Sequence, residues 1–74
     1  MRRRGLRPAL VRRVLTVPEQ VIELRPGRAV FQSRVRSGGR VYLVRVVVDV
    51  DRRPAEVVTV YRTSKVAKYW KESS

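Results

Sequence analysis

The sequence predicts an α+β fold: a four-stranded, mostly antiparallel sheet (a meander) with an N-terminal helix packed on it and a short C-terminal helix. Three observations predict this fold. Residues 41–51 alternate between two sets of side chains and are rich in valine, which is typical of a long β-strand. Residues 56–62 resume the alternation after a break at 51–54, so the two segments should form a hairpin. Both ends of the chain change to helical spacing, which gives the order α-β-β-β-β-α.

The N-terminal helix is expected at residues 8–16, after a basic arm at residues 1–6. Pro8 is acceptable in the first turn of a helix, and Pro18 ends it because the residue before a proline disfavours helical dihedrals. One side of this helix carries the apolar residues Leu10, Val11, Val14 and Leu15. The helix is short, so it depends on packing against the sheet rather than on helix propensity.

Two more strands are expected between this helix and the long hairpin. Residues 19–25 alternate weakly and predict an edge strand, and residues 29–36 predict the next strand. Pro26-Gly27 is a turn dipeptide, and Ser37-Gly38-Gly39 is a hairpin loop whose glycines tolerate positive φ.

The two faces of the sheet should differ. We expect the face with Val44, Val46 and Val48 to be buried beneath the N-terminal helix. The opposite face combines Arg45 with an apolar strip that consists of Val41, Leu43 and Val47. The C-terminal helix is expected to cover part of this face or to dock at the sheet edge. If the protein is an interaction module, the strip is expected to be exposed for a partner. Thr63 or Ser64 is expected to cap the C-terminal helix by accepting a backbone N–H. That helix carries an apolar stripe favouring a core role, made of Val66, Tyr69 and Trp70.

The composition limits the chemistry that is open to the chain. Its 74 residues make one domain, residues 1–74, with a small core. The sequence has no cysteine and no histidine, so disulfides, thiolate zinc sites and the commonest general base are excluded, and we expect neither a metal nor a cofactor. No apolar run is long enough to span a membrane, and Arg7, Arg12 and Arg13 interrupt any signal peptide. These features favour a cytoplasmic protein.

The charge is the strongest global feature. Eighteen Lys and Arg residues against six Asp and Glu residues give a net charge of +12. Such a charge favours polyanions and acidic partners. RNA, an acidic protein and a second copy of this chain are the partners considered, and the alternative is a basic surface that is simply solvated.

Arg45 is the first candidate functional residue, because it stands in a valine-rich strand where a charge needs solvent or a partner. Contact with a phosphate is one interpretation. The alternatives are an ion pair with Glu23 or Glu56, or a sheet face that a partner covers in use.

The junction between the last strand and the C-terminal helix supplies the other candidate catalytic residues, Tyr61, Arg62 and Lys65. Arginine and lysine hold phosphate, and tyrosine can move a proton where histidine is missing. Lys65 is expected in the first turn of the helix, where a cation is unfavourable unless an anion visits. Since positions 44–45 should lie opposite positions 61–62, we predict that Arg45, Arg62 and Lys65 converge at one end of the hairpin. The alternative for the lysine is a solvated side chain.

Four further cations are candidate RNA-binding residues: Arg34, Arg36, Arg40 and Lys68. The three arginines flank the loop at 37–39 and could track a phosphate backbone, although a solvated hairpin is an equal alternative.

Several segments together resemble a known bacterial family. They are Pro18-Glu19-Gln20-Val21, Tyr42-Leu43-Val44-Arg45-Val46, and the run from Val58 to Lys65 followed by Lys68-Tyr69-Trp70. The chain resembles, over nearly its whole length, the family named domain of unknown function (DUF) 4258. Members usually carry a further N-terminal stretch, commonly with a histidine, and this chain has neither. Either its start is placed internally, or the domain is a shortened member.

The resemblance implies a function. The family is considered similar to the RelE-like and BrnT-like toxins of toxin–antitoxin systems, which are small α/β proteins that cleave RNA. The resemblance therefore implies that this chain is a toxin-like RNA-binding protein. It also implies a ribonuclease activity that works without a metal, and a cognate antitoxin as partner. Fold similarity alone does not establish activity.

Overall fold

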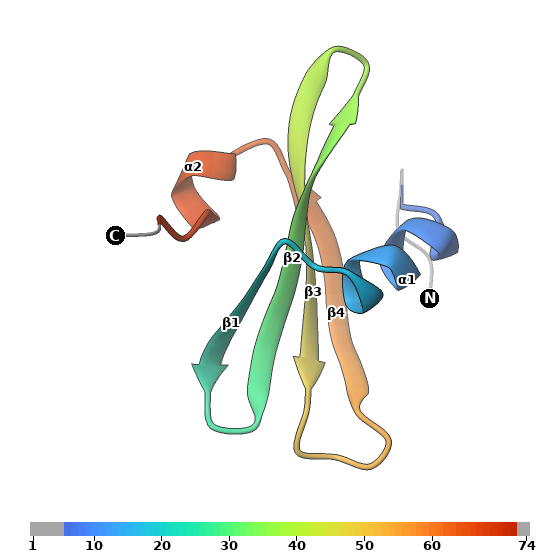
Figure 1. Ribbon diagram of the computed structural model, residues 1–74, viewed down its shortest axis with the longest axis vertical. Coiled ribbons are helices and arrows are strands. Elements are labelled where there is room, and N and C mark those ends of the chain that lie inside the picture. The colour runs from blue at the N-terminus through green and yellow to red at the C-terminus, as the bar shows by residue number, and fades with distance from the viewer. Residues whose placement is uncertain (1–5, 73–74) are drawn as a thin grey trace.

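The computed structural model describes residues 6–72 and confirms the expected fold (Figure 1). A single antiparallel sheet of four strands lies between two helices. The elements in chain order are α1 (Pro8–Thr16), β1 (Gln20–Arg25), β2 (Arg28–Ser37), β3 (Arg40–Asp49), β4 (Glu56–Thr63) and α2 (Val66–Tyr69). The strands lie side by side in the order in which they occur in the chain, so the sheet is a simple meander.

Local chemistry accounts for both ends of α1. Pro8 occupies the start of the helix, where its missing N–H costs no hydrogen bond. At the other end, the backbone N–H of Val17 donates to the carbonyl of Arg13 at 2.8 Å, and Arg13 places a cation in the last turn. A cation there complements the helix dipole.

The hairpin of β2 and β3 is the longest feature of the molecule, and it extends beyond the neighbouring strands (Figure 1). Ser37 pairs with Arg40, so the loop consists of Gly38 and Gly39, with φ of +59° and +76°. Glycine adopts these left-handed dihedrals without steric cost, and two such residues give the tight turn that matches strand twist.

The apolar core lies between α1 and one face of the sheet, as expected. Val14 of α1 is 1% exposed and packs against a patch of buried sheet valines. These valines are Val44, Val46, Val48 and Val60. Phe31 of β2 is half-buried at the border of this cluster. The N-terminal helix therefore depends on this one face of β3 and its neighbours.

The opposite face corrects one expectation. Leu43 is fully buried and Val47 is 9% exposed, so residues 41, 43 and 47 do not form an exposed apolar strip. Only Val41, near the hairpin tip, is exposed among the three. Part of this face lies under α2 and the residues that follow it, which Figure 1 shows on the side opposite α1.

Two boundaries also differ from the sequence pattern. β3 ends at Asp49 rather than at residue 51, because Val50 turns away and its N–H donates to the carbonyl of Gly27 at 2.9 Å. α2 begins at Val66, and within the described chain its N-terminus has no side-chain cap. The hydroxyl of Thr63 instead accepts the N–H of Lys65 at 3.0 Å, just before the helix. Neither helix in residues 6–72 is long and apolar enough to cross a membrane.

Candidate nucleic-acid interface

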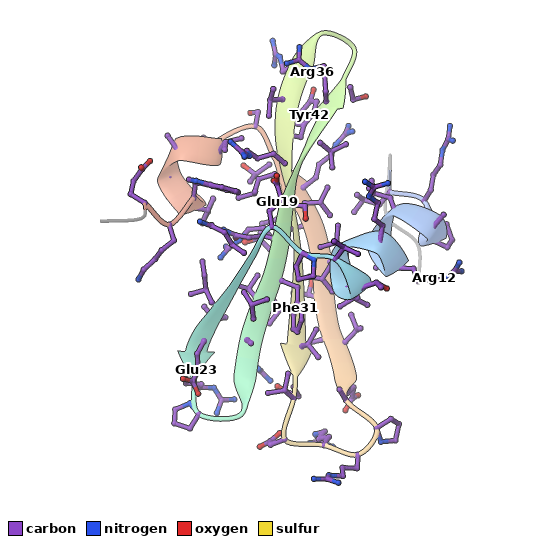
Figure 2. The ribbon with its side chains drawn as sticks, in the orientation of Figure 1. Arg12, Glu19, Glu23, Phe31, Arg36 and Tyr42 are labelled. Atoms are coloured by element: carbon purple, nitrogen blue, oxygen red, sulfur yellow. The ribbon has the colours of Figure 1, made fainter. Side chains whose placement is uncertain are left out.

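The charges are separated along the long axis of the molecule. Figure 2 shows Arg36 and Tyr42 near the tip of the β2–β3 hairpin and Glu23 at the opposite end. At that opposite end, Asp49 accepts two hydrogen bonds from the guanidinium of Arg28, at 2.6 and 3.1 Å, and Arg52 lies 3.8 Å from the same carboxylate. Asp49 is therefore paired with arginines of the same end, while Arg36 and Arg40 are exposed near the hairpin tip and keep that end basic.

A cleft of about 640 Å³ opens beside α1 at the basic end. Three arginines from different parts of the chain line it: Arg7, which precedes α1, Arg36 of β2 and Arg62 of β4. Its apolar walls come from Leu6, Leu10, Val35 and Val44. Among residues 6–72, no carboxylate lines this cleft. Such a combination suits a ligand that carries both an anionic group and a flat or apolar one.

Arg62 and Tyr42 form the organised part of this cleft. Arg62 pairs in register with Val44, and its guanidinium lies 4.5 Å from the ring centroid of Tyr42. Stacking on an aromatic ring orients the planar guanidinium while its N–H donors remain free to bind phosphate. Arg62 is exposed and Tyr42 is half-buried, so both are accessible. Ser37 adds a hydroxyl at the rim.

Arg45 lies on the other face of the sheet, in a cluster of polar and aromatic groups. Its Nε donates to Gln32 Oε1 at 2.8 Å, and its Nη1 donates to the hydroxyl of Tyr61 at 2.5 Å. The guanidinium also lies 4.4 Å from the ring centroid of Tyr69. Within the described residues, Arg45 has no ion pair, so the pairs considered with Glu23 and Glu56 do not form.

The predicted convergence of Arg45, Arg62 and Lys65 is therefore wrong. The register does place positions 44–45 opposite 61–62, and Arg45 does meet Tyr61. However, Arg45 pairs with Tyr61, and neighbouring residues of a strand point to opposite faces. Arg62 therefore lies on the α1 side of the sheet, while Arg45 and Tyr61 lie on the α2 side. Lys65 is exposed at the N-cap of α2 rather than in its first turn.

The candidate RNA-binding residues also divide into two groups. Arg34 is engaged within the protein: it contacts Glu19, with Nε–Oε1 at 3.1 Å, and stacks 4.2 Å from the Trp70 ring centroid. Its hydrogen bond to Glu19 holds the pKa of that carboxyl below its usual range. Arg36 and Arg40 remain exposed near the hairpin tip, and Lys68 lies 5.4 Å from the Tyr69 ring.

Tyr69 and Trp70 do not join the apolar core that the sequence pattern favoured for them. Both are half-buried, and both present their rings to arginines of the sheet, namely Arg45 and Arg34. Their role is to hold the C-terminal segment against a polar face.

Sequence reasoning missed three contributors. Arg7 and Tyr42 line the cleft, and Gln32 is fully buried at the centre of the opposite face. The expected pairing of positions 44–45 with 61–62, combined with the alternation along β3, puts Tyr42 on the same face as Arg62, so that signal was available. A buried glutamine in a valine-rich sheet has no such signal, because its partners come from distant residues.

The described residues contain no group of three or more acidic, histidine or cysteine side chains that could hold a metal ion. In comparisons with known proteins, no family model, no curated protein and no solved structure matches this chain.

Proposed function

We propose that this protein binds RNA, and that the basic cleft beside α1 is the contact site. The observation that carries the proposal is the lining of Arg7, Arg36 and Arg62 without a carboxylate among the described residues. Arginines held together in this way repel one another, and a bound phosphate backbone relieves the repulsion. Each guanidinium can present a two-pronged set of donors to a phosphate.

Three further facts support RNA over a small anion. The net charge of +12 exceeds what a single small anion would neutralise. Tyr42 and the apolar walls of the cleft offer a stacking and packing surface for a base. The resemblance of the run from Val58 to Lys65 to a family considered similar to RNA-cleaving toxins points in the same direction.

The test is the binding of a fluorescein-labelled single-stranded RNA, followed by anisotropy between 25 and 250 mM salt. We expect binding at low salt and a linear fall of log K with log salt concentration, since cations that contact phosphate release counterions. If the protein leaves the RNA unbound at the lowest salt, the proposal is wrong. A control with sulfate in place of RNA shows whether the cleft binds any anion of the size of a phosphate or requires the RNA polymer.

Cleavage of RNA is a second candidate function, favoured by Tyr42, whose ring lies beside the guanidinium of Arg62 in the cleft. A tyrosine can act in proton transfer where histidine is missing, and the arginine can stabilise charge on the phosphate. The test is incubation of the labelled RNA with purified protein, with and without a chelator. Products that persist with the chelator and vanish in Tyr42→Phe support metal-independent cleavage, and an intact RNA limits the function to binding.

A toxin-like role is proposed from the family resemblance, and its test is induced expression in bacteria. Growth arrest with the native chain and normal growth with Arg62→Gln would support it.

The alternative of a module for an acidic protein was based partly on an exposed strip at residues 41, 43 and 47. Leu43 and Val47 are buried, so this support is lost and RNA is the better-supported partner.

A further inference from the structure

The chain segment 66–72, named here the strap, lies on the side of the sheet opposite α1 (Figure 1). It consists of the short helix α2 and the three residues that follow. Every residue of α2 keeps part of its surface exposed, and Trp70 after it is half-buried. The strap is therefore laid on the sheet rather than built into an apolar core.

Two glutamine side chains hold the strap by its backbone. The amide of Gln20 forms two hydrogen bonds with Lys71: its Nε2 donates to the carbonyl at 2.6 Å, and its Oε1 accepts the N–H at 3.1 Å. Gln32 Nε2 donates to the carbonyl of Tyr69 at 3.2 Å. Water can replace each of these bonds when the strap lifts, so the net free energy that they contribute is small.

Arg45 lies beneath the strap with neutral partners. Gln32, Tyr61 and Tyr69 satisfy or stack on its guanidinium, and within residues 6–72 no carboxylate pairs with it. The strap itself brings further positive charge over this face, at Lys68 and Lys71. A half-buried cation without a counterion, under a weakly held and basic cover, is electrostatically favourable to an incoming anion.

We propose that Arg45 is a second phosphate contact, covered by the strap in the free protein and uncovered when RNA displaces the strap. The proposal rests on the proposed RNA binding and adds to it a regulated second site. The geometry of β4 links the two sites. β4 is an edge strand, and its consecutive residues Tyr61 and Arg62 face the Arg45 cluster and the cleft respectively. An RNA strand that crosses this edge can reach both faces.

Hydrogen exchange at the amide of Lys71 reports on the strap directly, because this N–H is bonded to Gln20 only when the strap is closed. The experiment measures exchange of this amide in the full chain, alone and with saturating single-stranded RNA. Anisotropy of the labelled RNA is recorded in parallel, so that binding and strap opening are separate readouts. We expect RNA to accelerate exchange at Lys71 by about tenfold or more.

The Gln20→Ala variant gives the sharper test, since it removes both bonds to Lys71 but no charge and no group in the cleft. If RNA must displace the strap, a weaker strap raises the open population and tightens RNA binding, by roughly three- to tenfold. Trp70→Ala should act in the same direction through loss of its contact with Arg34. Circular dichroism shows whether each variant keeps the sheet.

Arg45→Gln and Arg53→Gln are a matched pair, because each removes one positive charge. Arg53 is exposed in the loop after β3, at the end of the molecule opposite the β2–β3 hairpin tip. We expect Arg53→Gln to keep the response of Lys71 to RNA and Arg45→Gln to abolish it, while RNA still binds in the cleft. If the native protein leaves RNA unbound, the proposed function fails. If RNA binds but Lys71 exchange is unchanged or slower, or if Gln20→Ala binds RNA no more tightly, the strap inference fails and the cleft proposal stands.

Discussion

Arg45 Nε donates to Gln32 Oε1 at 2.8 Å, so the cation of the central strand is held by a neutral amide. Gln32 is fully buried, and its two amide protons go to Gln20 Oε1 and to the carbonyl of Tyr69. One side chain therefore connects β1, β3 and the C-terminal segment. Because the amide leaves the charge of Arg45 uncompensated, the arrangement holds the arginine in place without neutralising it.

The first prediction concerns this amide. Gln32→Ala removes the oxygen that accepts from Arg45 and the amide that donates to the carbonyl of Tyr69. It leaves these polar groups unpaired in a buried position. We expect the free energy of unfolding to fall by about 1–3 kcal/mol. Urea unfolding followed by circular dichroism of the sheet measures it. Arg36→Ala, on the same strand but exposed, is the control and should change stability by less than about 0.5 kcal/mol. Equal effects of the two changes would contradict the role given to Gln32.

The second prediction tests the packing of α1. Val14 is 1% exposed and contacts the valine patch, whereas Val17 just after the helix is 69% exposed. Val14→Ala should lower the free energy of unfolding by about 2 kcal/mol through lost burial and a residual cavity. Val17→Ala removes the same atoms at an exposed site and should have almost no effect. Similar losses for both variants would show that α1 is not docked as described.

The third prediction concerns Trp70. Since the ring is half-buried and lies beneath the guanidinium of Arg34, Trp70→Ala should cost about 1–2 kcal/mol, less than a fully buried tryptophan would. Trp70→Phe keeps a ring at this position and should recover part of the loss. Thermal unfolding by circular dichroism measures both. A cost equal to that of a core aromatic residue, about 3–5 kcal/mol, would contradict the half-buried position.

The fourth prediction follows from two carboxylates. Hydrogen bonds from Arg34 lower the pKa of Glu19, and hydrogen bonds from Arg28 lower the pKa of Asp49. A carboxyl whose pKa is lower in the folded state stabilises the fold above its unfolded pKa of about 4 and loses this effect as the pH falls through the folded value. The melting temperature should therefore drop as the pH is lowered from about 5 to about 2.

Glu19→Gln and Asp49→Asn provide the control for this pH dependence. Each variant removes one of the two groups, so each should show a smaller drop in melting temperature over the same pH range. If the native chain melts at the same temperature across the range, the two hydrogen-bonded carboxylates contribute nothing to stability.

The fold followed from the sequence because its signals are local. Alternation placed β3 and β4, the two prolines bounded α1, and two consecutive glycines marked the hairpin loop between Ser37 and Arg40. The C-terminal end of β3 was less predictable. Val50 continues the alternation of β3, but its N–H pairs with Gly27, and such a long-range contact leaves no trace in the local pattern.

The candidate site followed only in part. Arg45 and Tyr61 do meet, and Arg62 does face a cleft lined by arginines, but on the other side of the sheet. The error came from treating closeness along the strand as closeness in space, since residues next to each other in a strand point in opposite directions. The ion pair of Arg34 with Glu19 and its stacking on Trp70 join three separate segments of the chain. The sequence pattern of any one segment does not reveal these contacts.

The most direct test of the central claim compares Arg62→Gln with Arg53→Gln in RNA binding over a range of salt concentrations. Both variants lose one positive charge, so they differ only in whether the lost charge lies in the cleft. We predict that Arg62→Gln weakens binding by roughly tenfold and lowers the salt slope by about one, while Arg53→Gln changes the affinity by less than about twofold. Equal, small losses for the two variants would mean that net charge alone attracts the RNA, and would contradict a binding site in the cleft.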